Sequence, residues 1–372
     1  MVDLKTQYHR MKTEIDEAIL EVLESTQFIK GPAVKKFEDD FARYMGVKDV
    51  ISCANGTDAL QIAMMALGYQ PDDEVITASF TYVATAEVIA LLKLKPVLVE
   101  VNPDTFTIDP AAIEAAITPR TKAIVPVHLF GQAADMEAIL KIAQKHGLHV
   151  IEDNAQATGA DITFSDGRKV KAGTVGTVGT TSFFPSKNLG CYGDGGALFV
   201  NDDELAKKIR VVSNHGQTQQ YVHDEIGVNS RLDTIQAAIL DVKLKYLDEY
   251  AAKRRSVADS YDKAFKGLKN VQTPVRASYS NHVFHQYTLK LNGTNRDEVR
   301  NKLSELGIPS MIYYPIALHL QKAYKDSRYK EGAFPVTESL CKSVLSLPIH
   351  TEFEPEQLEY IQENFIKIVQ SS

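Results

Sequence analysis

The sequence predicts an α/β fold, with a large mixed, mainly parallel sheet domain and a smaller α+β domain at the C-terminal end. Strand-like and helix-like segments alternate from about residue 50 to residue 152, which is typical of a sheet covered by helices on both faces. The chain has 372 residues, more than one hydrophobic core usually accommodates. Because a long helix expected over 231–265 would lead out of the large domain, we expect a large domain at 1–245 and a small domain at 246–372.

The elements of the first domain follow from apolar spacing. Residues 8–22 carry apolar side chains at helical intervals and predict an opening amphipathic helix. The helices expected after it are 34–44, 57–67, 82–92, 109–116 and 136–146. The short apolar strands expected between them are 50–54, 74–78, 96–101, 123–127 and 150–152. In such sheets, ligands bind beyond the carboxyl ends of the strands.

The remaining chain mixes strands and helices without a regular order. Apolar spacing over 231–265 predicts a long helix that leads out of the large domain. The elements expected beyond it are strands at 284–291, 311–314 and 344–347 and helices at 296–306 and 354–369. This segment is therefore expected to form the α+β domain.

Composition excludes several classes of function. The net charge is −7, and Lys and Arg are spread along the chain, which argues against a nucleic-acid or membrane-surface role. No apolar run approaches the ~20 residues that a membrane span needs. The three cysteines lie far apart in no paired spacing, and the ten histidines show no metal-ligand spacing. We therefore expect a cytoplasmic protein without a bound metal.

A lysine stands between two predicted strands in the stretch 180–196, T-T-S-F-F-P-S-K-N-L-G-C-Y-G-D-G-G. The first strand stops at Pro185, which has no backbone donor for a sheet ladder. Lys187 follows in a loop of small residues, and the next strand begins at Gly196. Such a lysine suits Schiff-base chemistry, while a surface lysine in a glycine-rich hairpin is the alternative. These residues alone do not distinguish between the two interpretations of Lys187.

Polar residues at other predicted strand ends suggest cofactor contacts. Gly56 and Thr57 begin a helix, whose free N–H groups can bind a phosphate, although a helix cap explains them equally. Asp153 follows an apolar strand; an acid there can keep a pyridine nitrogen protonated, and a turn acid is the alternative. In an enzyme with a pyridoxal cofactor, Gln156 could hydrogen-bond the hydroxyl group of the pyridine ring. Tyr82 could stack on that planar ring, and a core or surface aromatic is the alternative.

Further candidates lie near the predicted domain boundary and beyond it. Asn229 and Arg231 stand at the start of the long predicted helix, where anions can bind. Tyr313, Tyr314 and His319 lie in a loop of the C-terminal domain, where a solvated loop is the simpler interpretation.

Seven motifs occur in the order in which the sugar-nucleotide aminotransferases of the DegT/StrS type carry them. They are G-P-A-V-K-K-F-E, N-G-T-D-A-L, T-Y-V-A-T-A, V-H-L-F-G-Q, I-E-D-N-A-Q-A, F-F-P-S-K-N-L-G and N-S-R-L-D-T-I-Q-A-A. The sequence resembles this family over nearly its whole length. The resemblance implies the aspartate-aminotransferase-like fold type I and the cofactor pyridoxal 5′-phosphate (PLP).

The resemblance also implies roles for individual residues. Lys187 matches the catalytic lysine that bonds to the cofactor, and Asp153 the catalytic partner of the pyridine nitrogen. The positions that match cofactor contacts are Gly56, Thr57, Tyr82, Asp153, Gln156, Ser182, Lys187 and Asn229. Relatives supply the residue at Asn229 from a second subunit, which implies a homodimer with composite sites. The positions that match substrate contacts are Arg231, Tyr313, Tyr314 and His319.

The implied reaction moves an amino group from glutamate to a keto sugar nucleotide. The stretch 183–196 looks most like the branch that acts on UDP-2-acetamido-2-deoxy-3-keto-D-glucuronate, in the synthesis of surface polysaccharide such as lipopolysaccharide O-antigen. A dTDP-linked 3-keto sugar, or a UDP- or dTDP-linked 4-keto sugar, is the alternative substrate.

Two other classes of function remain as hypotheses. A regulatory protein can keep this fold and cofactor without turnover, since fold does not determine function. The intact Lys187, Asp153 and Gln156 argue against it. The second class is a PLP lyase or desulfurase. Cys191 lies near Lys187 in the sequence, but the sequence has no separate flexible loop that would present a catalytic cysteine.

Overall fold

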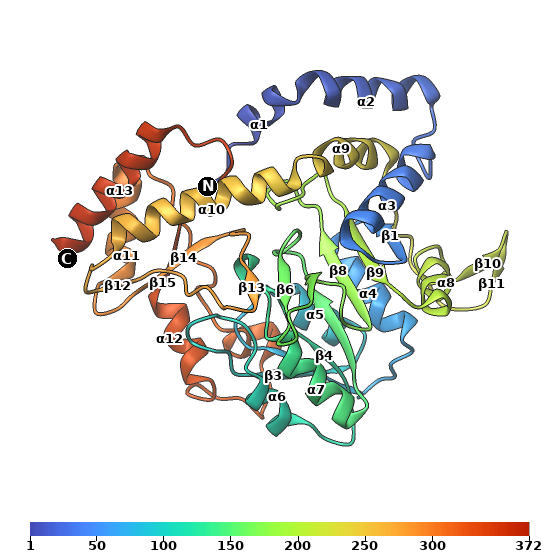
Figure 1. Ribbon diagram of the computed structural model, residues 1–372. Helices are drawn as coiled ribbons and strands as arrows, with labels where there is room; N and C mark the ends of the chain where they lie inside the picture. The colour runs from blue at the N-terminus through green and yellow to red at the C-terminus, as the bar shows by residue number, and fades with distance from the viewer. Residues whose placement is uncertain (372) are drawn as a thin grey trace.

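A seven-stranded sheet forms the centre of the computed structural model, which describes residues 1–371 (Figure 1). The strand order is β1-β9-β8-β5-β4-β2-β3. The strands are β1 (Asp49–Cys53), β2 (Glu74–Ala78), β3 (Lys95–Val99), β4 (Thr121–Val125), β5 (His149–Asp153), β8 (Val178–Ser182) and β9 (Gly196–Val200). Only β9 runs antiparallel to its neighbours, β1 and β8, so the sheet is mixed and mainly parallel, as the sequence predicts.

Helices cover both faces of this sheet because successive side chains of a strand point to opposite faces. On one face, alternate strand residues pack against α4 (Gly56–Ala66), α5 (Ala84–Leu91) and α8 (Asp203–Val212). The other face packs against α6 (Pro110–Ala116) and α7 (Met136–His146) at one end of the sheet. At the other end it packs against α3 (Pro32–Met45) and α9 (Thr234–Leu244).

A second core belongs to the C-terminal segment. The antiparallel sheet β12-β14-β15 consists of β12 (Val271–Gln272), β14 (Tyr287–Leu291) and β15 (Val344–Leu347). Its apolar side chains pack against those of α10 (Leu247–Phe265), α11 (Arg296–Glu305) and α13 (Pro355–Gln370). These elements form the α+β part of the molecule. The boundary at residue 246 falls between α9 and α10, and the division into 1–245 and 246–372 stays a prediction.

Smaller elements connect the two cores. Helices α1 (Leu4–Arg10) and α2 (Lys12–Ser25) run across the molecule from α10 towards α3 (Figure 1). The remaining strands are β6 (Asp161–Thr163), β7 (Lys169–Lys171), β10 (Gln217–Gln219), β11 (Val222–His223) and β13 (Ser280–Asn281). The remaining helices are α12 (Pro335–Ser343) and the short η1 (Leu129–Gly131), η2 (Leu318–Leu320) and η3 (Lys322–Tyr324). The hairpin β10–β11 protrudes from the body (Figure 1).

Three predicted elements differ from the observed ones. The long helix expected over 231–265 is two helices, because the Tyr246 N–H bonds to the Lys243 carbonyl in a tighter turn that ends α9. The opening helix divides in the same way at Met11, whose N–H bonds to the Tyr8 carbonyl. The strand expected at 311–314 is a single bridge between Met311 and Ser346.

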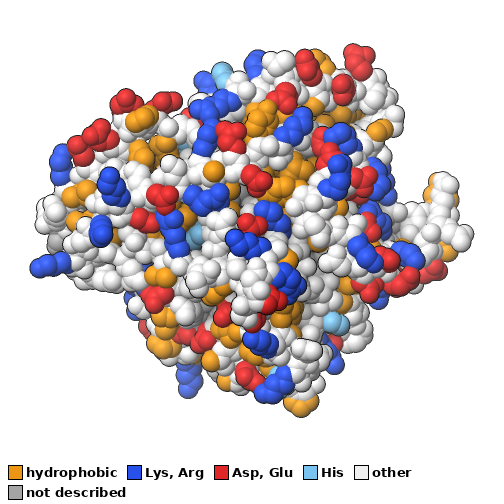
Figure 2. Space-filling model, in the orientation of Figure 1, with side chains coloured by type: hydrophobic (Ala, Val, Ile, Leu, Met, Phe, Trp, Pro, Cys, Tyr) orange, Lys and Arg blue, Asp and Glu red, His pale blue; other side chains and the backbone are white. Residues whose placement is uncertain are grey.

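The surface has no extended region of one charge on the face shown in Figure 2, where Lys and Arg side chains alternate with Asp and Glu. Within residues 1–371, no helix combines the length and apolar character needed to cross a lipid bilayer. No group of three or more His, Cys, Asp or Glu side chains in that part of the chain is arranged to hold a metal ion.

Candidate active site

The candidate site lies where β5 and β8, which are neighbours in the sheet, reach their carboxyl ends. Asp153 is the last residue of β5 and Ser182 the last of β8. The loop after β8 then brings Lys187 to this edge, and its backbone N–H donates to the Phe184 carbonyl at 2.8 Å. A place beyond the carboxyl ends of parallel strands is the expected ligand position in such sheets.

The amine of Lys187 is activated by its surroundings. Burial removes it from water and lowers its pKa to about 8, while the neighbouring carboxylate of Asp153 opposes this shift. Within residues 1–371, Lys187 Nζ makes no hydrogen bond and no ion pair. Because part of the side chain remains accessible, a neutral amine is available for nucleophilic attack at near-neutral pH.

Asp153 is buried and oriented by two donors. The Thr85 hydroxyl, in α5, donates to Asp153 Oδ2 at 2.9 Å, and the Ala155 N–H donates to Oδ1 at 3.1 Å. Asp153 is 6% exposed, so its position is determined by protein contacts rather than by solvent. The carboxylate can therefore present a fixed negative charge beside Lys187. Nothing in the local sequence around Asp153 indicated Thr85, which lies 68 positions away.

A buried network behind Asp153 holds the end of β5. Glu152 accepts hydrogen bonds from the N–H groups of Gly173, Val175 and Gly176 and lies 2.9 Å from His128 Nε2. Since His128 Nδ1 accepts the N–H of Ala134, Nε2 carries the proton and donates to Glu152. The backbone of His128 also bonds to the Asp153 carbonyl at 3.0 Å. The network thus positions Asp153 through its own main chain.

Gln156 lies three residues after Asp153, and two hydrogen bonds hold its side-chain amide. Its Oε1 accepts the N–H of Phe130 at 2.8 Å, and its Nε2 donates to the hydroxyl of Tyr314 at 3.1 Å. The second N–H of the amide has no partner among the described residues, so Gln156 can still donate one hydrogen bond to a ligand. The structure therefore brings Gln156 and Tyr314 together at the site.

The start of α4 meets the end of β8 closely enough to form a phosphate cradle. A Cβ on Gly56 would lie 2.7 Å from the Cβ of Ser182, so only glycine fits there. Asn55 caps α4 by accepting the Asp58 N–H, which leaves the N–H groups at Gly56 and Thr57 for a ligand. The carboxylate of Asp58 accepts the Ser230 hydroxyl at 2.6 Å.

The aromatic candidates differ in their positions. Tyr82 is 54% exposed, and its ring lies 6.3 Å from that of Tyr314, so a face remains open for stacking. The ring of Tyr313 lies edge-on to Tyr314 at 5.9 Å. The side chain of His319 is fully buried, with Nε2 3.0 Å from Glu338, and its implied contact with substrate stays a prediction.

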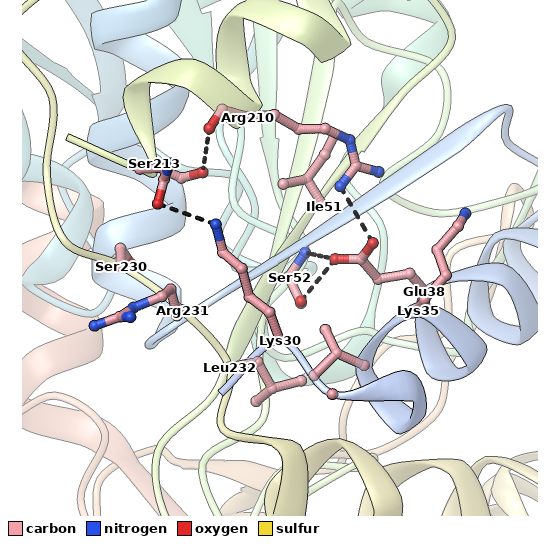
Figure 3. Close-up of a pocket in the computed structure, with 13 residues that line it drawn as sticks. Lys30, Lys35, Glu38, Ile51, Ser52, Arg210, Ser213, Ser230, Arg231 and Leu232 are labelled. Atoms are coloured by element: carbon pink, nitrogen blue, oxygen red, sulfur yellow. Dashed lines mark hydrogen bonds and ion pairs between the residues drawn. The ribbon is translucent and has the colours of Figure 1, made fainter. Parts of the chain in front are cut away.

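No hydrogen bond or ion pair within residues 1–371 joins Asn229 or Arg231 to Lys187 or Asp153, although Ser230 between them donates to Asp58 at the start of α4. Asn229 is exposed, and its backbone bridges to Asn214. Arg231 lines a separate cavity (Figure 3). Their implied contacts with a cofactor or substrate therefore stay predictions.

His285 is a neighbour of Lys187 that sequence reasoning missed. Burial, together with the charges of Lys187 and Arg254, holds the pKa of His285 well below its usual range, so the ring is neutral. Its Nδ1 is buried and has no partner in the part of the chain described here. The only sequence signal was a position in a predicted strand at 284–291, which gave no reason to place His285 at the site.

The lowered pKa of Lys187 predicts a pH dependence. Only the neutral amine attacks a carbonyl, and the neutral form dominates above the pKa. When the apoprotein is mixed with pyridoxal phosphate, we expect the rate of covalent attachment to rise with pH around a midpoint of about 8. Stopped-flow absorbance checks this. A midpoint above 10, the range of an ordinary lysine, would contradict the desolvation of Lys187.

The comparisons with known proteins bear directly on this cluster. Residues 9–366 match the DegT/DnrJ/EryC1/StrS aminotransferase family. The chain belongs to this family. It is similar to the "Pleiotropic regulatory protein" of Geobacillus stearothermophilus, with 50% identity over 98% of this chain and 96% of that protein. It is also similar to the UDP-2-acetamido-2-deoxy-3-oxo-D-glucuronate aminotransferase of Pseudomonas aeruginosa, with 49% identity over 97% of each chain.

Solved structures of similar proteins confirm the aminotransferase fold. DesV of S. venezuelae is 41% identical, with a TM-score of 0.94 over 99% of this chain and 98% of that one. NtdA of Bacillus subtilis, solved with bound PMP, is 33% identical, with a TM-score of 0.88 over 97% of this chain and 82% of that one.

The residues of this aminotransferase fit PLP as the cofactor. Lys187 offers a desolvated amine, and the N–H groups of Gly56 and Thr57 at the start of α4, beside Ser182, are free to bind a phosphate. Asp153 offers a fixed carboxylate for a pyridine nitrogen, and Gln156 a free N–H for the ring oxygen. The chain is a PLP-dependent aminotransferase.

Proposed function

We propose that this sugar-nucleotide aminotransferase takes the amino group of glutamate and places it on C3 of UDP-2-acetamido-2-deoxy-3-keto-D-glucuronate. The observation that carries this choice is the 49% identity, over nearly the full length of both chains, to an aminotransferase named for that 3-oxo sugar. The cluster of Lys187, Asp153 and Gln156 around one strand edge supplies the groups that the reaction needs.

Each residue then has a defined task. PLP, when bound, withdraws electrons from the reacting carbon and stores the amino group between the two halves of the reaction. Lys187 carries the proton between C4′ of the cofactor and C3 of the sugar. Asp153 holds the proton on the pyridine nitrogen, and Gln156 orients the ring by a hydrogen bond to its oxygen.

The protein works as a homodimer in this proposal. Asn229 is exposed and has no side-chain partner among the described residues, as expected of a ligand that serves the neighbouring subunit. The three cysteines are unpaired, which suits the reducing cytoplasm where sugar nucleotides for surface polysaccharide are made.

A panel of keto sugar nucleotides with glutamate tests the substrate. We expect the UDP-linked 3-keto uronic acid to be converted at least about tenfold faster, in kcat/KM, than a dTDP-linked 3-keto or any 4-keto sugar, since a site built for a polar group discriminates strongly. The appearance of 2-oxoglutarate is the measurement. A preference for a 4-keto or dTDP-linked sugar would contradict this substrate and leave the aminotransferase assignment unchanged.

A regulatory function is the second candidate, because the relative with 50% identity is named a pleiotropic regulatory protein. The residues that fit PLP, which include Lys187 and Asp153, favour a catalytic protein over one that only regulates. The same panel separates the two functions. A protein that shows no continued release of 2-oxoglutarate, beyond one equivalent per site, with any keto sugar would support regulation.

A further inference from the structure

A second lysine, Lys243, is buried beneath the loop that carries Lys187. It belongs to α9, and only 1% of its surface is exposed. Its ammonium group donates to the Gly190 carbonyl at 2.5 Å and lies 5.0 Å from the centre of the Tyr192 ring. Residues 190–192 form the limb of the loop that returns to β9, so Lys243 makes both of these contacts with that limb.

The charge of Lys243 has no carboxylate partner. The side chain makes no ion pair within residues 1–371. Burial lowers its pKa to about 8, so the amine is still mostly protonated at pH 7. A buried cation without an anionic partner destabilises the folded state, and an apolar side chain of similar size would avoid that cost. The presence of a lysine here therefore indicates a role other than packing.

The carbonyl that Lys243 binds belongs to the residue where the loop of Lys187 closes. A Cβ on Gly190 would lie 2.5 Å from the Pro185 oxygen and 2.8 Å from the Phe184 oxygen, so the two limbs of the loop touch there. The same Phe184 carbonyl accepts the backbone N–H of Lys187 at 2.8 Å. A shift of Gly190 is therefore passed to the backbone of Lys187 through two close contacts.

Helix α9 holds this limb at a second point. Gln236 lies seven residues before Lys243, which places the two side chains on the same face of the helix. Gln236 Oε1 accepts the N–H of Tyr192 at 2.8 Å, and a Cβ on Gly193 would lie 3.2 Å from the Gln236 amide nitrogen. One face of α9 therefore contacts the whole returning limb, residues 190–193.

Neutral groups make the other contacts of the loop. Asn188 Nδ2 donates to the Val283 carbonyl at 3.2 Å, and the Cys191 N–H donates to the Phe183 carbonyl at 2.8 Å. The contact from Lys243 differs from these two because an ammonium group makes it, and charge-assisted hydrogen bonds are roughly twice as strong as neutral ones. Of these contacts, we expect its loss to loosen the loop most.

We propose that Lys243 is a positioning residue for transamination, which holds the loop through the Gly190 carbonyl and so fixes the position of the Lys187 amine in the site. An amine that attacks a carbon and then moves a proton must be placed accurately, and an error of about 1 Å can reduce a rate about 10²-fold. Lys243 lies beneath the loop and acts only through it. This inference rests on the role that the proposed function gives to Lys187, and it does not depend on which sugar accepts the amino group.

Lys243→Met tests the proposal, because it keeps the length of the side chain and removes its charge and its N–H donors. In the PLP-loaded variant, we expect the single-turnover rate with saturating glutamate to fall about 10–100-fold. The Kd of glutamate should change by less than about threefold, since Lys243 does not touch the substrate. Lys243→Arg, which restores the charge and the donors, should recover most of the lost rate. Stopped-flow absorbance of the cofactor measures the rate.

A second measurement, on the apoprotein, separates positioning from stability alone. The pKa of Lys187 is lowered by burial and raised by the carboxylate of Asp153, and the charge of Lys243 is not among these causes. A loosened loop admits water to Lys187, which reduces the effect of burial and raises that pKa. We therefore expect the pH midpoint for covalent attachment of pyridoxal phosphate to rise in Lys243→Met, from about 8 towards the ~10.4 of an ordinary lysine.

Lys245→Met is the matched control. Lys245 caps the end of α9, is exposed, and pairs with Glu14 of α2 at 3.3 Å instead of contacting the loop. Its rate and pH midpoint should equal those of the wild type. An equal loss in this control would overturn the proposal. Folded Lys243→Met with an unchanged rate and midpoint, even with a lower melting temperature, would also overturn it.

Two further outcomes are distinguishable. If Lys243→Met does not fold, Lys243→Gln, which keeps a neutral N–H donor, takes its place with the same expected directions and the same conditions for rejection. Wild-type protein that attaches no pyridoxal phosphate would contradict the role of Lys187, and the proposal with it. Failure of the 3-keto uronic acid as a substrate leaves the proposal standing, since both measurements need only glutamate and the cofactor.

Discussion

Lys187→Ala should abolish transamination, with kcat/KM for every amino acceptor reduced by at least about 10³-fold, since the proposed function makes this residue both the nucleophile and the proton carrier. No other amine can replace it at this edge of the sheet. The second buried lysine, Lys243, donates to the Gly190 carbonyl at 2.5 Å beneath the loop and does not face the site. Steady-state release of 2-oxoglutarate measures the loss.

The fold should survive this substitution. Lys187 Nζ has no hydrogen-bond partner within residues 1–371, and burial lowers the pKa of the amine to about 8. Below pH 8 the folded apoprotein therefore carries a desolvated charge, which destabilises it relative to the unfolded chain. We expect Lys187→Met, which keeps the length without the charge, to unfold at the same or a higher temperature at pH 7. Retention of activity in either variant would contradict the central assignment.

The same variant tests the composite site. Mixed with a variant altered only at Asn229, Lys187→Ala should form hybrid dimers in which one of two sites has every residue intact. With free exchange of subunits in equal amounts, about a quarter of the wild-type activity returns. Recovery that stays at zero while hybrid dimers form would rule out a contribution of Asn229 to the partner's site.

Local patterns predicted the parts of the site that lie on single strand ends. Asp153 ends the apolar strand β5, so its place at the ligand-binding edge of the sheet was predicted from the sequence. Ser182 was assigned only by the resemblance, and the strand there was expected to run to Pro185, whereas β8 ends at Ser182. The loop that carries Lys187 is bounded by Pro185 and a glycine run, and both signals are local as well. The resemblance to the aminotransferase family then assigned the roles of these residues.

Contacts between distant segments could not be predicted in this way. Thr85 reaches Asp153, and His128 reaches Glu152, through packing of helices and loops that no local spacing records. The cavity that Lys30 and Arg231 line depends on a loop that contacts α9 some 200 residues later. The sequence analysis also missed the end of α9. Apolar side chains continue at helical spacing through Tyr246, whereas the turn that ends the helix depends on one hydrogen bond from the Tyr246 N–H to the Lys243 carbonyl.

Asp153→Asn should reduce the rate of the half-reaction with glutamate on the order of 10²–10³-fold, the usual effect of removing one electrostatic stabiliser at a buried site. An amide cannot hold the proton on the pyridine nitrogen by charge, although its oxygen still accepts from Thr85 or Ala155. Thr85→Val is the graded control, because it removes only the 2.9 Å bond that orients Asp153 Oδ2 and leaves the carboxylate in place. We expect that variant to lose about tenfold or less, and Thr85→Ser to recover most of it.

A second measurement separates the charge of Asp153 from its role in packing. The carboxylate raises the pKa of Lys187, against the lowering by burial, so its removal should shift the pH midpoint for covalent attachment of pyridoxal phosphate to the apoprotein below about 8. Thr85→Val keeps the charge and should leave that midpoint unchanged. A merely structural Asp153 would slow the reaction without moving the midpoint, whereas a shift in Asp153→Asn alone ties the charge of this carboxylate to the reactivity of Lys187.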